Sequence, residues 1–193
     1  MPTSLGQVKC KTCTPLLGSK NSYEISKLNS SVLLAHAWLY PFEQARNLIH
    51  ISKFNGEFCH YRHQSVSLAR AIKDIEVTSG LVFDICYVPT IAEHIRKRGF
   101  DHARVMAKKT ALCTHKDLID DLKALHNQSQ VGKSRVERMN NPKFVCHSNL
   151  LGKNLILLDD VASTRSTLFH AAKALKTARA KNVIALTLSL NSK

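Results

Sequence analysis

The sequence alternates short, continuous apolar runs with longer segments whose apolar residues recur at helical spacing. The apolar runs include residues 83–88, 155–158 and 183–188, and helical patterns cover residues 100–113 and 164–179. A strand that is apolar throughout is typical of a parallel sheet buried on both faces. We therefore predict an α/β domain with a parallel central sheet flanked by helices.

The first part of the chain adds one strand and two helices to this prediction. Residues 32–40 read as a strand, and Pro41 suits the first position of the helix that follows. That helix should end before the turn signal Asn55-Gly56, and a second should cover about residues 60–75. Earlier residues show no comparable pattern. We expect an N-terminal appendage over residues 1–31 and the α/β domain over residues 32–193.

The charge of the chain limits the kinds of partner it can have. Lys and Arg number 28 and Asp and Glu 14, which gives a net charge of +14. The hydrophobic fraction of 44% is ordinary for a globular protein, so a disordered basic tail is excluded as the main feature. Nucleic acid or another anion is the expected partner. No apolar run suggests a membrane span or a secretory signal, so we expect a cytoplasmic protein without membrane insertion.

The most informative segment is residues 154–168, NLILLDDVASTRSTL. Asp159 and Asp160 come where the apolar strand ends, and adjacent carboxylates there are costly unless they face a crevice. The hydroxylated residues that follow lie at a predicted helix start, whose free N–H groups attract an anion. Acids beside an anion site suggest a phosphorylated sugar as ligand. The alternative is that this segment only caps the helix, with Ser163 or Thr164 as the N-cap.

The segment resembles the phosphoribosyl pyrophosphate (PRPP) motif of type I phosphoribosyltransferases. Three further segments narrow the resemblance to the ComF/GntX competence family. They are residues 48–54 (LIHISKF), 84–103 (DICYVPTIAEHIRKRGFDHA) and 130–144 (QVGKSRVERMNNPKF), in the family's order. The resemblance implies a phosphoribosyltransferase fold, PRPP and Mg²⁺ as ligands, and a role in natural transformation, in which the cell takes up DNA.

The resemblance also implies roles for individual residues. Asp159 and Asp160 would be the catalytic acids that hold the ribose hydroxyls. PRPP would also be bound by the residues after them, namely Val161, Ala162, Ser163, Thr164, Arg165, Ser166 and Thr167. The residues expected to contact pyrophosphate or DNA are Arg96, Lys97, Arg98 and Lys53. A flexible loop that closes over the substrate would include Gln130 and Arg138.

The sequence departs from the family pattern at three places, one of which is a shorter segment between Asn141 and Phe144. The family usually has Thr-Thr-Gly where this chain has Ser163-Thr164-Arg165, and a glycine there lets the backbone approach phosphate and adopt a conformation that bulkier residues resist. Arg165 could add a cation to the site or fill it. Asp101-His102 stands where the family commonly has Asn-Gln.

Two functions therefore remain open. The first is an Mg²⁺-dependent phosphoribosyltransferase. The second is a non-catalytic protein that uses the same fold to bind single-stranded DNA or a DNA-uptake helicase.

Two further features of the sequence bear on a binding role. Residues 94–98 (HIRKR) are expected to form a basic loop that contacts a polyanion, and the alternative is an ordinary solvated surface. Cys10 and Cys13 have the spacing of half a zinc ribbon, but the second pair is missing. Because structural zinc needs four ligands, we do not expect zinc to bind.

Overall fold

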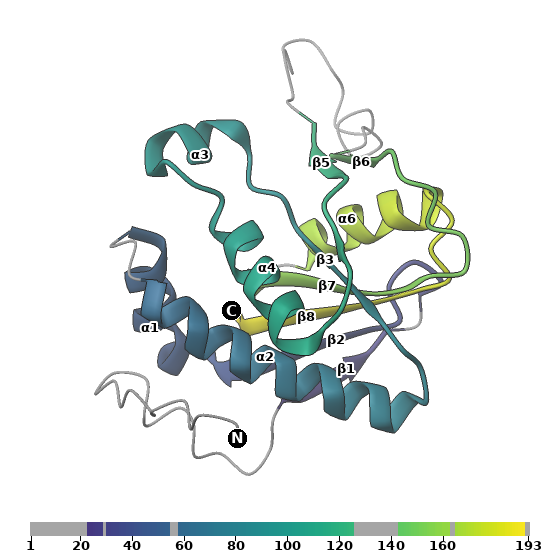
Figure 1. The fold of residues 1–193 in the computed structure, drawn as a ribbon, viewed down its shortest axis with the longest axis horizontal. Helices are drawn as coiled ribbons and strands as arrows, with labels where there is room; N and C mark the ends of the chain where they lie inside the picture. Colours follow the sequence, from purple (N-terminus) through teal and green to yellow (C-terminus); the bar gives the residue numbers. More distant parts are fainter. Residues whose placement is uncertain (1–22, 29, 55–57, 126–142, 163–164, 192–193) are drawn as a thin grey trace, which may run out of the picture.

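The computed structural model describes residues 23–28, 30–54, 58–125, 143–162 and 165–191. Its centre is a six-stranded sheet in the order β1-β2-β8-β7-β3-β4 (Figure 1). All neighbouring strands are parallel except β1 and β2. The strands are β1 (Glu24–Lys27), β2 (Ala35–Pro41), β3 (Asp84–Tyr87), β4 (Leu118–Ile119), β7 (Asn154–Ala162) and β8 (Asn182–Leu190). The predicted α/β class with a parallel central sheet is confirmed.

Helices cover both faces of the sheet and enclose two hydrophobic cores. One core lies between the sheet and the helices α1 (Phe42–Phe54), α2 (Phe58–Ser79) and α4 (His102–Thr114). The other lies beneath α6 (Ser166–Thr177) and the antiparallel pair formed by β5 (Leu122–Ala124) and β6 (Phe144–Cys146). A short helix, α3 (Ala92–Arg98), stands off the body of the domain (Figure 1).

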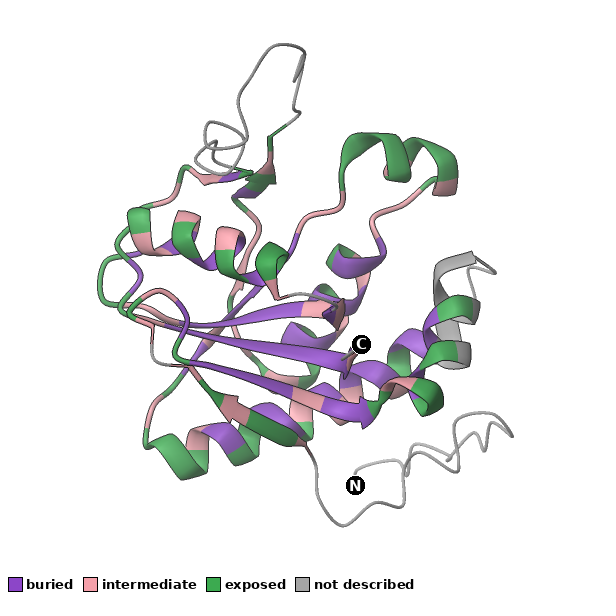
Figure 2. Cartoon of the chain, turned by 180° about the vertical axis from the view of Figure 1, so that it is seen from behind, coloured by how far each residue is buried: buried purple, intermediate pink, exposed green. Residues whose placement is uncertain are grey.

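The central strand β7 explains why the apolar runs do not alternate with polar residues. Leu155 and Leu157 belong to the core beneath α6, whereas Ile156 and Leu158 belong to the core beneath α2 and α4. All four are 0% exposed, and the sheet is buried along its middle in Figure 2. Both faces of this strand are therefore core faces, as the continuous apolar run predicted.

The strand β7 is longer than the sequence analysis predicted, and the helix after it starts later. It runs through Asp159 and Asp160 to Ala162, because pairing with β8 continues from Leu158 opposite Leu186 to Ala162 opposite Leu190. The predicted helix start at residue 164 is corrected to Ser166. Arg165 precedes that helix in a left-handed conformation, with φ 56° and ψ −5°, which cannot continue an α-helix.

The basic run at residues 94–98 is helical, which corrects the prediction of a loop. It forms most of α3, where Lys97 donates to Glu93 at 2.9 Å, one helical turn away. Gly99 ends the helix with φ 81° and donates its N–H to the carbonyl oxygen of Ile95 at 2.7 Å. No residue of α3 is buried (Figure 2). The helix therefore lacks the apolar period on which the prediction relied.

Part of the predicted appendage takes part in the sheet. Residues 24–27 form the edge strand β1, which the sequence analysis did not predict. Cys10 and Cys13 lie outside the described residues. Within the described part, no group of three or more His, Cys, Asp or Glu side chains could hold a metal ion. None of the helices described is both long and apolar enough to cross a membrane.

Candidate functional site

The topology of the sheet marks one of its edges as the place where a ligand is expected. β3 and β7 are parallel neighbours, with Tyr87, the last residue of β3, opposite Leu158 in the middle of β7. After β7 the chain passes through α6 on one face and returns as β8, whereas after β3 it passes through α4 on the other face and continues to β4. In open α/β sheets, ligands bind outside the carboxyl ends of strands where the connections diverge in this way.

Asp160 lies at this edge with its carboxylate held by two hydrogen bonds. Its side chain is buried, with 6% exposure. One oxygen, Oδ2, is 2.9 Å from Nε2 of His102, and Oδ1 accepts from the backbone N–H of Val161 at 2.7 Å. Alternation along the strand places Asp159 on the opposite face, where its Oδ1 accepts from the N–H of Asp160 at 2.8 Å.

His102 connects Asp160 to the basic helix α3. Nη1 of Arg98 is 3.0 Å from Nδ1 of His102. A guanidinium group only donates, so Nδ1 must accept and the imidazole carries its hydrogen on Nε2, which donates to Asp160. The side-chain amide of a glutamine also offers one acceptor and one donor. This equivalence explains how His102 can occupy the position at which the resembled family commonly has Gln.

Asp101 fixes the position of His102. It is the N-cap of α4 and accepts from the backbone N–H of Ala103 at 3.1 Å. The hydroxyl of Thr90, in the loop after β3, donates to the same carboxylate at 2.9 Å. Asp101 therefore ties the end of β3 to the start of α4, a role that an asparagine cap could also fill.

Tyr61 is a residue of the site that sequence reasoning missed. It comes from α2 and is 1% exposed, and its ring meets the edge of Phe100 at 6.4 Å between centroids. Burial raises the pKa of Tyr61, and the negative charge of Asp160 raises it further. The phenol of Tyr61 is therefore neutral, and it lies close enough to Asp160 to be affected by the charge of the carboxylate. In the sequence, Tyr61 is a single tyrosine on the apolar face of a helix, and no motif marks it as part of a site.

Arg165 occupies a glycine-like conformation at the position where the resembled motif has glycine. Its guanidinium carbon lies 5.9 Å from the centroid of the Trp38 ring on β2, close enough for a cation–π contact. Its Nε is buried without a hydrogen-bond partner among the described residues. The side chain is therefore directed toward β2, and it brings a positive charge close to the N-terminus of α6.

This conformation leads to a stability prediction. A non-glycine residue in the left-handed region costs about 1 kcal/mol, so Arg165→Gly should remove that cost together with the Trp38 contact. Arg165→Ala removes the contact and keeps the cost. In urea unfolding, the glycine variant should exceed the alanine variant in free energy of unfolding by about 1 kcal/mol. Equal stabilities of the two variants would contradict a left-handed residue here.

The structure brings only some of the predicted site residues together. Arg98, His102 and Asp160 form one hydrogen-bonded group, which we call the Asp160 cluster. Arg96 and Lys97 are instead exposed on α3. Val161 and Ala162 lie within β7, where they pack against the cores. The remaining predicted residues of the first helical turn are Ser166 and Thr167 at the start of α6.

Other predicted site residues cannot be placed. Ser163, Thr164, Gln130 and Arg138 lie outside the described residues. Lys53 falls within α1, but its side chain is not among those described.

Comparison with curated proteins finds relatives across most of the chain. The protein named "Competence protein ComFC" from Streptococcus pneumoniae (strain ATCC BAA-255 / R6) is 21% identical over 188 residues, which cover 95% of this chain and 81% of that protein. The protein of the same name from Bacillus subtilis (strain 168) is 31% identical over 109 residues, which cover 55% of this chain and 44% of that protein. No family model matches the chain.

Proposed function

The chain belongs to the ComF family of competence proteins, and from that premise we propose that it binds PRPP and acts in natural transformation. The proposed binding site is the carboxyl edge of β7 and β3. The observation that carries the proposal is the buried carboxylate of Asp160, held in a fixed orientation at the divergence point of the sheet.

The proposed pose uses the groups on both sides of this edge. The carboxylates of Asp160 and Asp159 accept hydrogen bonds from the ribose hydroxyls. The first turn of α6 follows the strand within a few residues and contains no acidic side chain. Its N–H groups have no partner within the helix, so they suit the 5-phosphate. Arg98 supplies positive charge near the pyrophosphate.

The donor atoms at this edge also fit Mg²⁺. This ion prefers oxygen ligands and is usually bound by one or two carboxylates together with substrate phosphates and water. Asp159 and Asp160 are the residues that would hold it. Phosphate oxygens of the substrate would complete the coordination of the ion. When bound there, it would neutralise charge on the leaving pyrophosphate.

Transfer of the phosphoribosyl group is the chemistry that such a site would support. As the bond between the anomeric carbon and pyrophosphate breaks, positive charge develops on the ribose. Two carboxylates placed at the ribose hydroxyls stabilise that charge more strongly than they stabilise the neutral ground state. The acceptor would be the nucleophile that completes the reaction at the anomeric carbon.

A thermal shift experiment tests the binding step. A ligand present at 100 times its dissociation constant stabilises the folded protein by about 2.7 kcal/mol. PRPP with Mg²⁺ should therefore raise the melting temperature by several degrees, and Mg²⁺ with pyrophosphate should raise it less, because pyrophosphate lacks the ribose. No shift at millimolar PRPP would overturn the proposal.

Substitutions of His102 test its role as a positioning residue for Asp160. His102→Gln should keep the affinity for PRPP within about threefold, because the amide can accept from Arg98 and donate to Asp160. His102→Ala leaves the buried carboxylate short of one hydrogen bond, which costs about 1–3 kcal/mol. Its affinity should fall at least about tenfold and its stability should also fall. Equal losses in both variants would show that the imidazole has a different role.

Exposed cations favour single-stranded DNA binding as a second function. Arg96 and Lys97 are exposed on α3, and the whole chain carries a charge of +14. If α3 contacts DNA, affinity should fall steeply with salt as counterions are released. Arg96→Ala/Lys97→Ala should reduce that slope, whereas Lys108→Ala, an exposed change on α4, should leave it unchanged. A salt dependence that the α3 variant does not alter would exclude this helix as the DNA contact.

The binding of a helicase remains a prediction from the family resemblance.

A further inference from the structure

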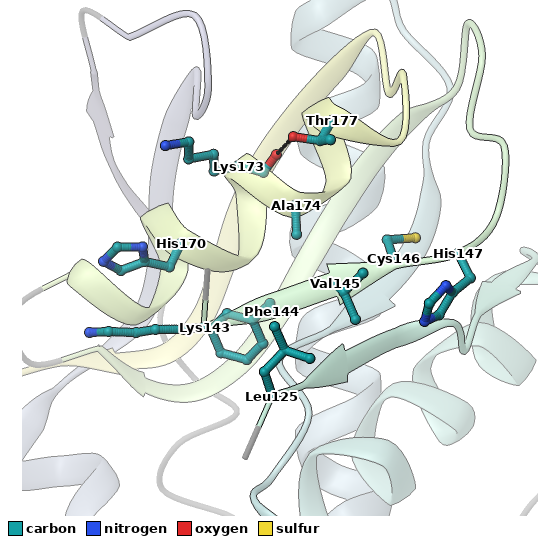
Figure 3. A pocket seen from close by; sticks show the side chains of 10 residues that line it. All are labelled: Leu125, Lys143, Phe144, Val145, Cys146, His147, His170, Lys173, Ala174 and Thr177. Atoms are coloured by element: carbon teal, nitrogen blue, oxygen red, sulfur yellow. Dashed lines mark hydrogen bonds between the residues drawn. The ribbon is translucent and has the colours of Figure 1, made fainter. Parts of the chain in front are cut away.

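A cavity of about 490 Å³ lies between α6 and the pair β5–β6 (Figure 3). Its walls come from one face of α6, on which His170, Lys173 and Ala174 follow at helical spacing, and from β6 with its flanking residues. The opposite face of α6 packs on the central sheet through Leu168 and Leu175. The cavity therefore borders the core that α6 shares with the sheet, and Phe144 belongs to both.

The body of this cavity is apolar. Phe144, which is 8% exposed, Val145 and Ala174 line its middle, and Leu125 lines its rim with 39% exposure. Water in a cavity needs two to four polar partners, which these side chains do not supply. The volume lies within the range of about 300–1,000 Å³ that is typical of small-molecule sites. An apolar group is thus the occupant that this part of the cavity suits.

One end of the cavity is cationic. Figure 3 shows the side chains of His170 and Lys143 extending in the same direction from α6 and from just before β6, and Lys173 extending from α6 beyond His170, farther from β6. Burial lowers the pKa of His170, and the positive charges of Lys143 and Lys173 lower it further. Both lysines therefore lie close enough to the imidazole to affect its protonation. Among the lining residues that the structure describes, none is acidic. A negative group bound at this end would relieve the repulsion among His170, Lys143 and Lys173.

We propose that this cavity binds a small amphiphilic anion, with its apolar body against Phe144 and Ala174 and its single carboxylate or phosphate between Lys143 and Lys173. Charge complementarity is the argument for the occupant, since the described lining residues supply cations but no acidic side chain at this end. The proposal is independent of PRPP binding, because none of its residues belongs to the Asp160 cluster.

The first test uses the fluorescent anion 8-anilino-1-naphthalenesulfonate. It should bind saturably at one site, and decanoate should displace it. Decanol, which lacks the charge, and inorganic phosphate, which lacks the apolar body, should displace it at least about tenfold less well. PRPP with Mg²⁺ should not displace it. Equal displacement by decanol and decanoate would overturn the proposal, and so would displacement by PRPP with Mg²⁺.

Substitutions of the residues that line the cavity test whether the anion binds there. Lys143→Ala/Lys173→Ala should weaken decanoate binding at least about tenfold and leave decanol unaffected, whereas Lys108→Ala should change neither. Ala174→Trp should fill the cavity and abolish dye binding. Both lysines are exposed, so their replacement should leave the fold intact. Dye binding that survives all of these changes would refute the site. A concentration-dependent dimer that Ala174→Trp disrupts would show instead that a second copy covers the cavity.

Discussion

Asp160→Asn is expected to lower the affinity for PRPP by about ten- to a hundredfold. A hydrogen bond to a charged group contributes about 1.5–3 kcal/mol, and the neutral amide cannot replace a carboxylate at the ribose hydroxyls. The dissociation constant can be measured by equilibrium dialysis with radiolabelled PRPP in the presence of Mg²⁺. Asp117→Asn removes the same charge from an exposed position and should leave the affinity unchanged.

The same substitution should also destabilise the protein. Both oxygens of Asp160 accept hydrogen bonds, one from His102 and one from the N–H of Val161. Asparagine has one oxygen, so its NH₂ group must face one of these donors. His102 cannot change tautomer to help, because its Nδ1 accepts from Arg98. One buried donor left without a partner costs about 1–3 kcal/mol. Unchanged stability in urea unfolding would contradict this hydrogen-bond arrangement.

His36 should make the stability of the protein depend on pH. Its side chain is 0% exposed on β2, and Nε2 lies 2.9 Å from Oγ1 of Thr187. Thr187 donates its hydroxyl hydrogen to the carbonyl oxygen of Ser189, so it must accept from His36. Nδ1 of His36 has no hydrogen-bond partner in the described part of the chain. Burial lowers the pKa of His36 to about 4, and the charge of Arg165 contributes to this shift.

The direction of the pH effect follows from this pKa. Between pH 6.5 and about 4, the unfolded chain binds a proton at this residue that the folded protein does not bind. The free energy of unfolding should therefore decrease as the pH falls through this range, with a contribution of about 3 kcal/mol.

A matched pair of variants isolates this contribution. Urea unfolding of the wild type and His36→Gln at pH 7 and pH 4 gives the difference that belongs to His36, because carboxylates titrate in both proteins. His94→Gln, an exposed change on α3, should behave like the wild type. If His36→Gln loses as much stability as the wild type between the two pH values, His36 is not buried in its neutral form.

The order of elements could be predicted where a strand is buried on both of its faces, because such a strand appears in the sequence as a continuous apolar run. This holds for residues 155–158 of β7 and 183–189 of β8, which are buried. It fails for α3, which buries nothing, and for β4, β5 and β6, which have two or three residues each and are too short to show a period. The end of β7 was also missed, because pairing with β8 continues through two acids that the apolar pattern excludes.

The candidate site could be predicted only as far as its local motif. Asp159 and Asp160 are adjacent in the sequence, so their pattern is visible there. The surroundings of Asp160 come from residues far apart in the chain, because His102 on α4 hydrogen-bonds to it and the pKa of Tyr61 on α2 responds to its charge. No spacing rule links such positions before the fold is known. Arg165 is an intermediate case, since the missing glycine was visible but the contact with Trp38 was not.

Calorimetric titration of the wild-type protein with PRPP and Mg²⁺ tests the central claim most directly. We predict a saturable heat with about one site per chain, which Asp159→Asn/Asp160→Asn abolishes while circular dichroism shows that the variant is folded. The absence of heat with the wild type, or an equal heat with the folded double variant, would contradict a PRPP site at the carboxyl edge of β7.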